Sequence, residues 1–237
     1  MTNNQIKLIR SLALKKNRAK HQLFVVEGQK NIQELLNSDY EIETLFATNS
    51  WIEKHPGVIA EKILKTELSR ISNQKSPNEV LALVKMRNNL TPPDSAVTLI
   101  LDDINDPGNM GTIIRICDWF GVHSIICSNN TVDVYNPKVI QSAMGSIFRV
   151  VVTYTNLLEY MKDVHAPIYG ACMNGQDVNN ISFPESLYLV MGNEANGINR
   201  QLYQFIGNQV KIRNVGREVD SLNVAAATSI LLHKICS

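Results

Sequence analysis

Short apolar runs alternate with helix-like stretches through the second part of the chain. The segments between the runs place apolar side chains at helical spacing, as in Ile113, Ile114, Ile116 and Cys117. Buried parallel strands are nearly continuous apolar runs that helices connect. The pattern therefore predicts an α/β domain whose parallel sheet is covered on both faces. We expect its strands at Val97–Leu101, Val122–Cys127, Arg149–Thr153, Pro167–Ala171, Leu187–Met191 and Val210–Ile212.

The helices of this part begin after polar residues. We expect them after Gly111, over Asn136–Ala143, over Asn156–Met161, and from Leu222 to about Ile235 with Ser221 as the cap.

The first part of the chain has a mixed pattern. It predicts helices near Ile6–Ala13, at Asn31–Asn37 and at Glu67–Ile71, with strands at Leu23–Val26, Glu41–Ala47 and Val80–Met86. Residues 88–95 contain paired Asn and paired Pro with almost no apolar side chain, which is typical of a linker. We therefore predict a small mixed α/β domain over 1–87, a linker over 88–95 and the larger domain over 96–237.

Polar, glycine-containing segments follow three of the predicted strands: Asp102–Gly111, Asn193–Gly197, and the stretch after Ile212. Loops that lead from strand ends into helices often hold small ligands in α/β proteins. Neither a P-loop nor the G-x-G-x-x-G dinucleotide motif is present. Gly108 and Gly111 fit the G-x-x-G spacing of KH domains, but that spacing alone is weak evidence. Ordinary connections in a sheet protein would explain the same residues.

Charge is unevenly distributed, although the net charge is only +1. Residues 1–87 carry 14 Lys and Arg against 9 Asp and Glu, and residues 88–237 carry 9 against 13. Basic side chains gather before the first acidic residue, Glu27, and such a cluster suits a phosphate backbone. A solvated helix face explains it equally well. The cluster consists of Lys7, Arg10, Lys15, Lys16, Arg18 and Lys20.

Composition narrows the class of protein. The chain has 237 residues, 44% of them hydrophobic, with no apolar run of membrane-spanning length and no secretory signal at its start. Its four cysteines and five histidines are scattered. We therefore expect a cytoplasmic protein with reduced thiols, no membrane contact and no metal site.

Three motifs in order resemble the SpoU (TrmH-like) branch of the SPOUT RNA methyltransferases. They are Asp106–Arg115 with its N-x-G-x-x-x-R pattern, Leu189–Ile198, and Ser221–Ala227 near the chain end. Ser142–Arg149 is also similar to the family, and the first domain, with Phe24–Gly28, looks like its RNA substrate-binding domain. The chain departs from the family at Ile212-Arg213, where Ile-Pro is usual, and the following spacer to Ser221 is one residue longer.

The resemblance implies an α/β knot, in which the C-terminal segment threads through a loop to form a trefoil knot, and a homodimer with the site at the subunit boundary. S-adenosylmethionine would bind in the knotted loops, with Gly192 allowing the backbone to approach it. The cofactor-binding residues would be Gly192, Asn193, Ile212, Leu222 and Asn223. Small residues on the last helix, Ala225 to Ala227 and Ser229, would permit close helix packing in the dimer.

The implied activity is methylation of a ribose 2′-hydroxyl in RNA. Arg115 matches the family's catalytic arginine, and because a guanidinium rarely loses its proton, we expect it to grip phosphate and stabilise the developing alkoxide. Ribosomal RNA is the favoured substrate, since the family's tRNA enzymes often lack the first domain. The alternatives are a tRNA ribose methyltransferase and a non-catalytic RNA-binding protein. Other expected catalytic residues are Asn109, Glu194, Ser221 and Asn223.

Overall fold

The computed structural model describes residues 1–237 except 75, 88–90, 94, 217 and 219. Packing divides the chain into two compact units, one formed by Met1–Asn88 with Asp133–Phe148 and the other by Asn89–Val132 with Arg149–Ser237. Much of the predicted linker, namely residues 88–90 and 94, lies outside the described residues. The separation of 1–87 from 96–237 therefore stays a prediction.

The first unit contains a four-stranded mixed sheet in the order β1-β4-β2-β3. Strand β4 runs antiparallel to both β1 and β2, while β3 pairs with β2 in parallel. The strands are β1 (Leu23–Glu27), β2 (Ile42–Ala47), β3 (Glu61–Lys62) and β4 (Val80–Lys85). The helices are α1 (Asn3–Ser11), α2 (Lys15–His21), α3 (Gln29–Leu36), α4 (Asn49–Lys54) and α5 (Lys65–Ile71). The mixed α/β pattern predicted here is confirmed.

A segment from the middle of the chain also belongs to the first unit. It contains helix α7 (Pro137–Ala143) and the 3-10 turn η1 (Ser146–Phe148), and α7 packs on β1. The ring of Tyr135 lies 4.5 Å from that of Phe24, between centroids. Arg18, only 2% exposed, bonds through its guanidinium to Asp133 at 2.5 Å and to the carbonyl of Leu12 at 2.8 Å. The sequence pattern did not predict that this segment packs here.

The second unit contains a six-stranded sheet in the order β10-β8-β9-β5-β6-β7, and every pairing in it is parallel. This confirms the predicted parallel sheet. Its strands are β5 (Val97–Leu101), β6 (Ser124–Ser128), β7 (Val151–Thr155), β8 (Ile168–Asp177), β9 (Leu187–Met191) and β10 (Asn208–Lys211). β5 and β9 are central and almost wholly buried, which explains why they read as continuous apolar runs.

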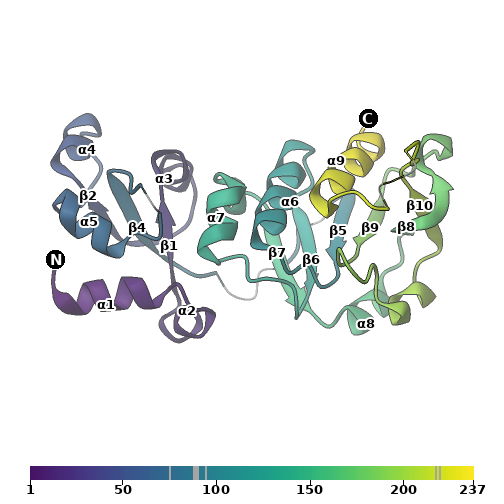
Figure 1. The fold of residues 1–237 in the computed structure, drawn as a ribbon, viewed down its shortest axis with the longest axis horizontal. Coiled ribbons are helices and arrows are strands. Elements are labelled where there is room, and N and C mark those ends of the chain that lie inside the picture. The colour runs from purple at the N-terminus through teal and green to yellow at the C-terminus, as the bar shows by residue number, and fades with distance from the viewer. Residues whose placement is uncertain (75, 88–90, 94, 217, 219) are drawn as a thin grey trace. The chain divides into compact units, whose positions relative to one another are not determined.

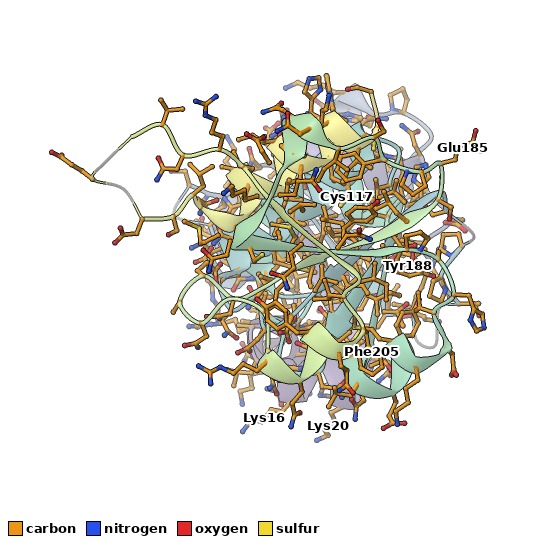
Figure 2. The ribbon with its side chains drawn as sticks, turned by 90° about the vertical axis from the view of Figure 1, so that its right-hand side faces the viewer. Lys16, Lys20, Cys117, Glu185, Tyr188 and Phe205 are labelled. Carbon is orange, nitrogen blue, oxygen red and sulfur yellow. The ribbon has the colours of Figure 1, made fainter. Side chains whose placement is uncertain are left out.

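Helices cover both faces of this sheet (Figure 1). Helices α6 (Pro107–Trp119) and α9 (Val224–Ile235) lie side by side on one face. On the other face, α8 (Leu157–Tyr160) and the 3-10 turn η4 (Arg200–Gln204) pack on Ile100, Ile126 and Val190. Tyr188 and Phe205, both labelled in Figure 2, pack against this same group of buried apolar residues. The remaining 3-10 turns are η2 (Met161–Asp163) and η3 (Val178–Asn180).

Two helix starts differ from the sequence prediction. Gly108 and Gly111 lie inside α6 rather than in a loop before it, because Asp106 caps the helix and Pro107 occupies its first turn. The Gly-x-x-Gly spacing is therefore helical here. Helix α9 begins at Val224, and Asn223 rather than Ser221 is its cap. Within the described residues, no helix is long and apolar enough to cross a membrane.

Candidate cofactor cleft and catalytic residues

A cleft of about 790 Å³ lies in the second unit, where β8, β9 and β10 end and α9 begins. Its size falls within the range of about 300–1,000 Å³ found for small-molecule sites. Gly192, Asn193, Glu194, Ile212, Ser221 and Leu222 line it, so the structure brings together most of the residues predicted for the cofactor. Asn223, also predicted, follows Leu222 but does not line the cleft.

The loop after β9 is held by its own side chains. The backbone N–H of Gly197 donates to the carbonyl of Asn193 at 2.9 Å, and the backbone N–H of Asn193 donates to the carbonyl of Gly197 at 3.1 Å. The amide oxygen of Asn193 accepts from the N–H groups of Ala195 and Asn196, and its Nδ2 donates to the carbonyl of Asp103 at 2.8 Å. Asn193 thus fixes the loop and ties it to the end of β5.

Gly192 is required by this loop itself. A Cβ atom at position 192 would lie 2.3 Å from the backbone carbon of Gly197 and 2.3 Å from the nitrogen of Ile198. Such contacts are far below van der Waals distance. Only glycine therefore lets the loop fold back onto the end of β9. The expectation that Gly192 also lets the backbone approach the cofactor stays a prediction.

Asn109 joins the three family motifs. Its Nδ2 donates to the carboxylate of Glu194 at 2.6 Å, and its Oδ1 accepts from Nδ2 of Asn223 at 2.9 Å. The backbone N–H of Asn109 donates to the capping carboxylate of Asp106 at 2.7 Å. Asn223 in turn accepts from the N–H groups of Ala225 and Ala226 at the start of α9. Three segments distant in sequence are therefore linked at one place.

Burial perturbs two groups near the cleft. Asp102, at the end of β5, is 7% exposed, and burial raises its pKa although the N–H of Asn199 donates to it at 2.7 Å and by itself lowers the pKa. Tyr203 lines the cleft, and burial likewise raises the pKa of its hydroxyl. A neutral phenol there offers both a donor and an acceptor.

Arg115 stands apart from the linked residues. It is exposed on α6, six residues after Asn109, and a helix separates two such positions by about 240° around its axis. It has no hydrogen-bond or ion-pair partner in the described part of the chain. Its guanidinium is therefore available to a group from outside this unit.

The loop that follows β10 carries several exposed side chains. Leu222 is 51% exposed and Val215 is 81% exposed. Ser221 is exposed at the cleft. Positions 217 and 219 of the predicted cofactor loop lie outside the described residues. Cys172, Met173 and Gln209 also line the cleft, and the sequence reasoning missed them. These residues lie on β8 and β10, which border the cleft. Only the order of the strands in the sheet shows this, and the sequence pattern does not contain that order.

The basic cluster is divided by the structure. Lys7, Arg10, Lys15, Lys16 and Lys20 are exposed, and Lys16 and Lys20 reach outward in Figure 2. Arg18 is buried with its guanidinium engaged by Asp133 and backbone carbonyls. The expectation that Arg18 contacts phosphate is therefore wrong, because its side chain is not presented to solvent.

Comparison with known proteins gives the family. The model of the SpoU rRNA Methylase family matches residues 96–233, and that of the MRM3-like substrate binding domain matches residues 3–82. The chain belongs to the SpoU rRNA methylase family. The family resemblance, the parallel α/β fold, the methyltransferase class and S-adenosylmethionine as cofactor, all predicted from the sequence, are confirmed.

Similar proteins match along nearly the whole chain. The 23S rRNA (guanosine(2553)-2′-O)-methyltransferase RlmP of Bacillus subtilis is 29% identical over 244 residues, covering 98% of this chain and 96% of that protein. A putative RNA methyltransferase of the TrmH family from Porphyromonas gingivalis is 34% identical, with a TM-score of 0.91, and the match covers 99% of this chain and 97% of that one. An AdoMet-bound rRNA methyltransferase from Sinorhizobium meliloti is 28% identical, with a TM-score of 0.88 and coverage of 99% and 95%.

The cleft fits S-adenosylmethionine. Ile198, Val210 and Leu231 give it apolar lining, while the ordered Asn193–Gly197 loop brings backbone polar groups and the carboxylate of Glu194. An adenine ring and a charged amino-acid end need this combination of surfaces. In the described residues, no group of three or more His, Cys, Asp or Glu side chains is placed to hold a metal ion.

Proposed function

We propose that the protein methylates a ribose 2′-hydroxyl of ribosomal RNA, with S-adenosylmethionine held in the cleft between β8, β9, β10 and α9. The observation that carries this proposal is the Asn223–Asn109–Glu194 hydrogen-bond chain beside the cleft. It holds the three motif segments in one arrangement. Preorganised polar groups need no rearrangement during the reaction, which is where much of enzymatic rate enhancement arises.

The roles of the residues follow from their positions. When bound, S-adenosylmethionine supplies an electrophilic methyl group. Gly192, Asn193, Ile212 and Leu222 would hold it, while Glu194 and Asn109 position the loop. Ser221 and Asn223 would lie near the ribose. Arg115 would bind the neighbouring phosphate and stabilise charge on the ribose oxygen, since a guanidinium offers several fixed donors.

We also propose that the enzyme is a homodimer whose site needs both protomers. Arg115 is free and exposed, whereas Asn109, Glu194 and Asn223 are already linked within one chain. A second copy that supplies its Arg115 to this cleft would complete the constellation. The C-terminal trefoil knot of the family and a cytoplasmic location remain part of the same proposal.

Ribosomal RNA is favoured over tRNA because the match to proteins named as rRNA methyltransferases includes the first unit. The B. subtilis and S. meliloti proteins match 98% and 99% of this chain. A structure titled for 2-OH methylation of C/U34 on tRNA covers 59% of it at 19% identity, which supports only the fold. The match over residues 3–82 makes that unit the proposed RNA-binding domain.

The test uses the purified full chain with S-adenosylmethionine carrying a labelled methyl group. Ribosomal RNA and tRNA from a strain that lacks the protein are offered separately. Ribose methylation is then located by resistance to alkaline cleavage, because a methylated 2′-oxygen cannot attack the adjacent phosphate. We expect label on one ribose of ribosomal RNA. Label in tRNA alone would favour the second substrate, and binding of RNA and cofactor without transfer would favour a non-catalytic protein.

A further inference from the structure

A second cavity, of about 360 Å³, lies inside the first unit, far in sequence from the cofactor loops. It is bordered by β1, the start of α3, the stretch after α5, and α7. Side-chain amides are its common feature, and we call it the amide pocket. They come from Asn31, Asn73, Gln74, Asn136 and Gln141. None of the catalytic or cofactor-binding residues discussed above borders it.

Asn31 is the decisive residue of the amide pocket. Its side chain is 6% exposed, and its Nδ2 donates to the carbonyl of Glu27 at 3.1 Å. That bond fixes which side of the amide carries the oxygen. Its Oδ1 is buried and has no hydrogen-bond partner among the described residues. Folded proteins leave few such acceptors unpaired, because each costs the lost hydration of the group. The oxygen is therefore an unpaired acceptor on a residue that lines the amide pocket.

Unused donors line the same pocket. The oxygen of Gln74 accepts from Asn78 at 2.9 Å, and that of Asn136 accepts from the N–H of Lys138 at 2.9 Å. The NH₂ groups of Gln74 and Asn136 make no hydrogen bond to the described residues. The side chains of Lys138 and Gln141 are exposed at the pocket. A ligand that both donates and accepts would match this set.

Hydrogen bonds within the first unit hold the pocket wall in place. The carboxylate of Glu27 accepts from the hydroxyl of Ser72 and, at 2.9 Å, from the N–H of Asn73. The N–H of Gln74 donates to Ser72 at 3.0 Å. These bonds hold the segment after α5 against β1. They also engage the charge of Glu27, because its carboxylate accepts from Ser72 and Asn73.

We propose that the amide pocket receives one unstacked nucleobase of the RNA and thereby helps to select the RNA that is methylated. A nucleobase carries donors and acceptors on its edge and has flat apolar faces, which Pro137 and Ile140 could contact. Single-stranded RNA is commonly recognised by such bases, splayed out and bonded at their edges. Lys138 would meet the adjoining phosphate. This inference rests on the proposed function, because it takes RNA as the substrate.

The test compares Asn31→Leu and Ala13→Phe with the wild type. Asn31→Leu keeps the volume and removes the unpaired acceptor, together with the bond from Nδ2 to the carbonyl of Glu27. Ala13 is exposed and lines the pocket, so Ala13→Phe places a ring at the pocket without disturbing the core. Gln33→Leu is the matched control, since Gln33 is exposed on α3, two residues from Asn31, and does not line the pocket. Affinity for a fluorescent ribosomal RNA fragment, affinity for S-adenosylmethionine and the melting temperature are measured for each full-length variant.

We expect both pocket variants to bind RNA on the order of tenfold more weakly, as for the loss of one base-edge contact. Cofactor affinity should not change, and Gln33→Leu should behave as the wild type. The melting temperature of Asn31→Leu should change little, because removal of the buried unpaired oxygen offsets loss of the bond to the carbonyl of Glu27. A melting temperature that falls strongly while RNA affinity stays at the wild-type value would show a purely structural role for Asn31 and would overturn the proposal.

A direct probe uses the four nucleoside monophosphates at millimolar concentration. At least one nucleotide should shift the side-chain amide resonance of Asn31 in the wild type. The same resonance should not shift in Ala13→Phe, where the ring covers the pocket. Unshifted resonances, together with unchanged RNA affinity in both variants, would mean that the pocket holds only water. Wild-type protein that binds RNA but transfers no methyl group would refute the proposed function, while the affinity comparison would still decide the role of the pocket.

Discussion

Asn109 donates to Glu194 at 2.6 Å while accepting from Asn223, so one amide joins the segments after β5, after β9 and before α9. The amide suits this position because it donates on one side and accepts on the other. Neither a carboxylate nor an aliphatic side chain could do both. Disturbing this one contact should therefore affect the whole site.

The first prediction concerns Asn109→Asp. Two carboxylates at this distance repel each other, and the shared site raises the pKa of one of them. Methyl transfer should fall on the order of ten- to a hundredfold, the effect of losing a hydrogen bond to a charged group. The defect should be smaller at low pH, where one carboxyl is protonated and donates again, and should grow as the pH rises. Adding Glu194→Gln should restore part of the rate, and independent effects of the two changes would refute the coupling.

The second prediction concerns Arg115. Arg115→Ala should lose on the order of a hundredfold or more in single-turnover methylation, while affinity for S-adenosylmethionine stays near wild type. Arg115→Lys should rescue little, since an ammonium cannot replace the planar fork. If the site is shared between protomers, mixing Arg115→Ala with a cofactor-deficient variant should recover partial activity. A chain that light scattering finds monomeric at micromolar concentration would contradict the shared site.

Gly192 supplies such a cofactor-deficient variant and the third prediction. In Gly192→Ala the new methyl group would meet the backbone of Gly197 and Ile198, so the loop must open. Calorimetry should show S-adenosylmethionine affinity lowered at least tenfold. Gly207→Ala is the control, because a Cβ there meets nothing within 4 Å. Equal cofactor affinity in the two variants would show that the loop adapts.

The fourth prediction separates Arg18 from its basic neighbours. Replacing Lys15, Lys16 and Lys20 by Glu should weaken RNA binding and lower the slope of log K against log salt by roughly one per lost phosphate contact. Cofactor affinity should not change. Arg18→Gln should instead lower stability and leave the salt slope nearly intact. If the lysine substitutions leave RNA affinity unchanged, these lysines belong to a solvated helix face and do not contact RNA.

The fifth prediction tests the Arg18–Asp133 pair. Removing one partner of a buried ion pair typically costs about 3–5 kcal/mol, and we expect Asp133→Ala to lower the free energy of unfolding of the first unit by about that amount. Of the two tryptophans, Trp51 is 2% exposed in this unit, so its fluorescence in a Trp119→Phe background reports urea unfolding there. Asp39→Ala is the control, because Asp39 is 83% exposed in its pair with Arg87 and should matter much less. Equal losses of unfolding free energy in the two variants would show that the buried pair contributes no more than the exposed one.

The sequence allowed the strands of the second unit to be predicted well because parallel strands such as β5 and β9 are buried on both faces. It also identified Asn109, Glu194 and Asn223 through the family motifs. Their mutual hydrogen bonds depend on the strand order, which no local pattern contains. The same holds for the burial of Arg18, whose partner lies 115 residues away. The start of α6 was misjudged because glycines suggested a loop, whereas Asp106 and Pro107 determine the helix.

The placement of Asp133–Phe148 in the first unit bears on how the chain can be shortened. Val139 and Ile140 of α7 are buried in that unit, where α7 packs on β1. A chain that begins at residue 96 would leave this helix without its partners, and one that ends at residue 87 would lose the Asp133 carboxylate that neutralises Arg18. We therefore expect neither half, cut at residue 87 or at residue 96, to be as stable alone as it is in the full chain. A chimera that takes the RNA-binding unit from a relative should therefore fold only when the segment equivalent to residues 133–148 comes from the same relative.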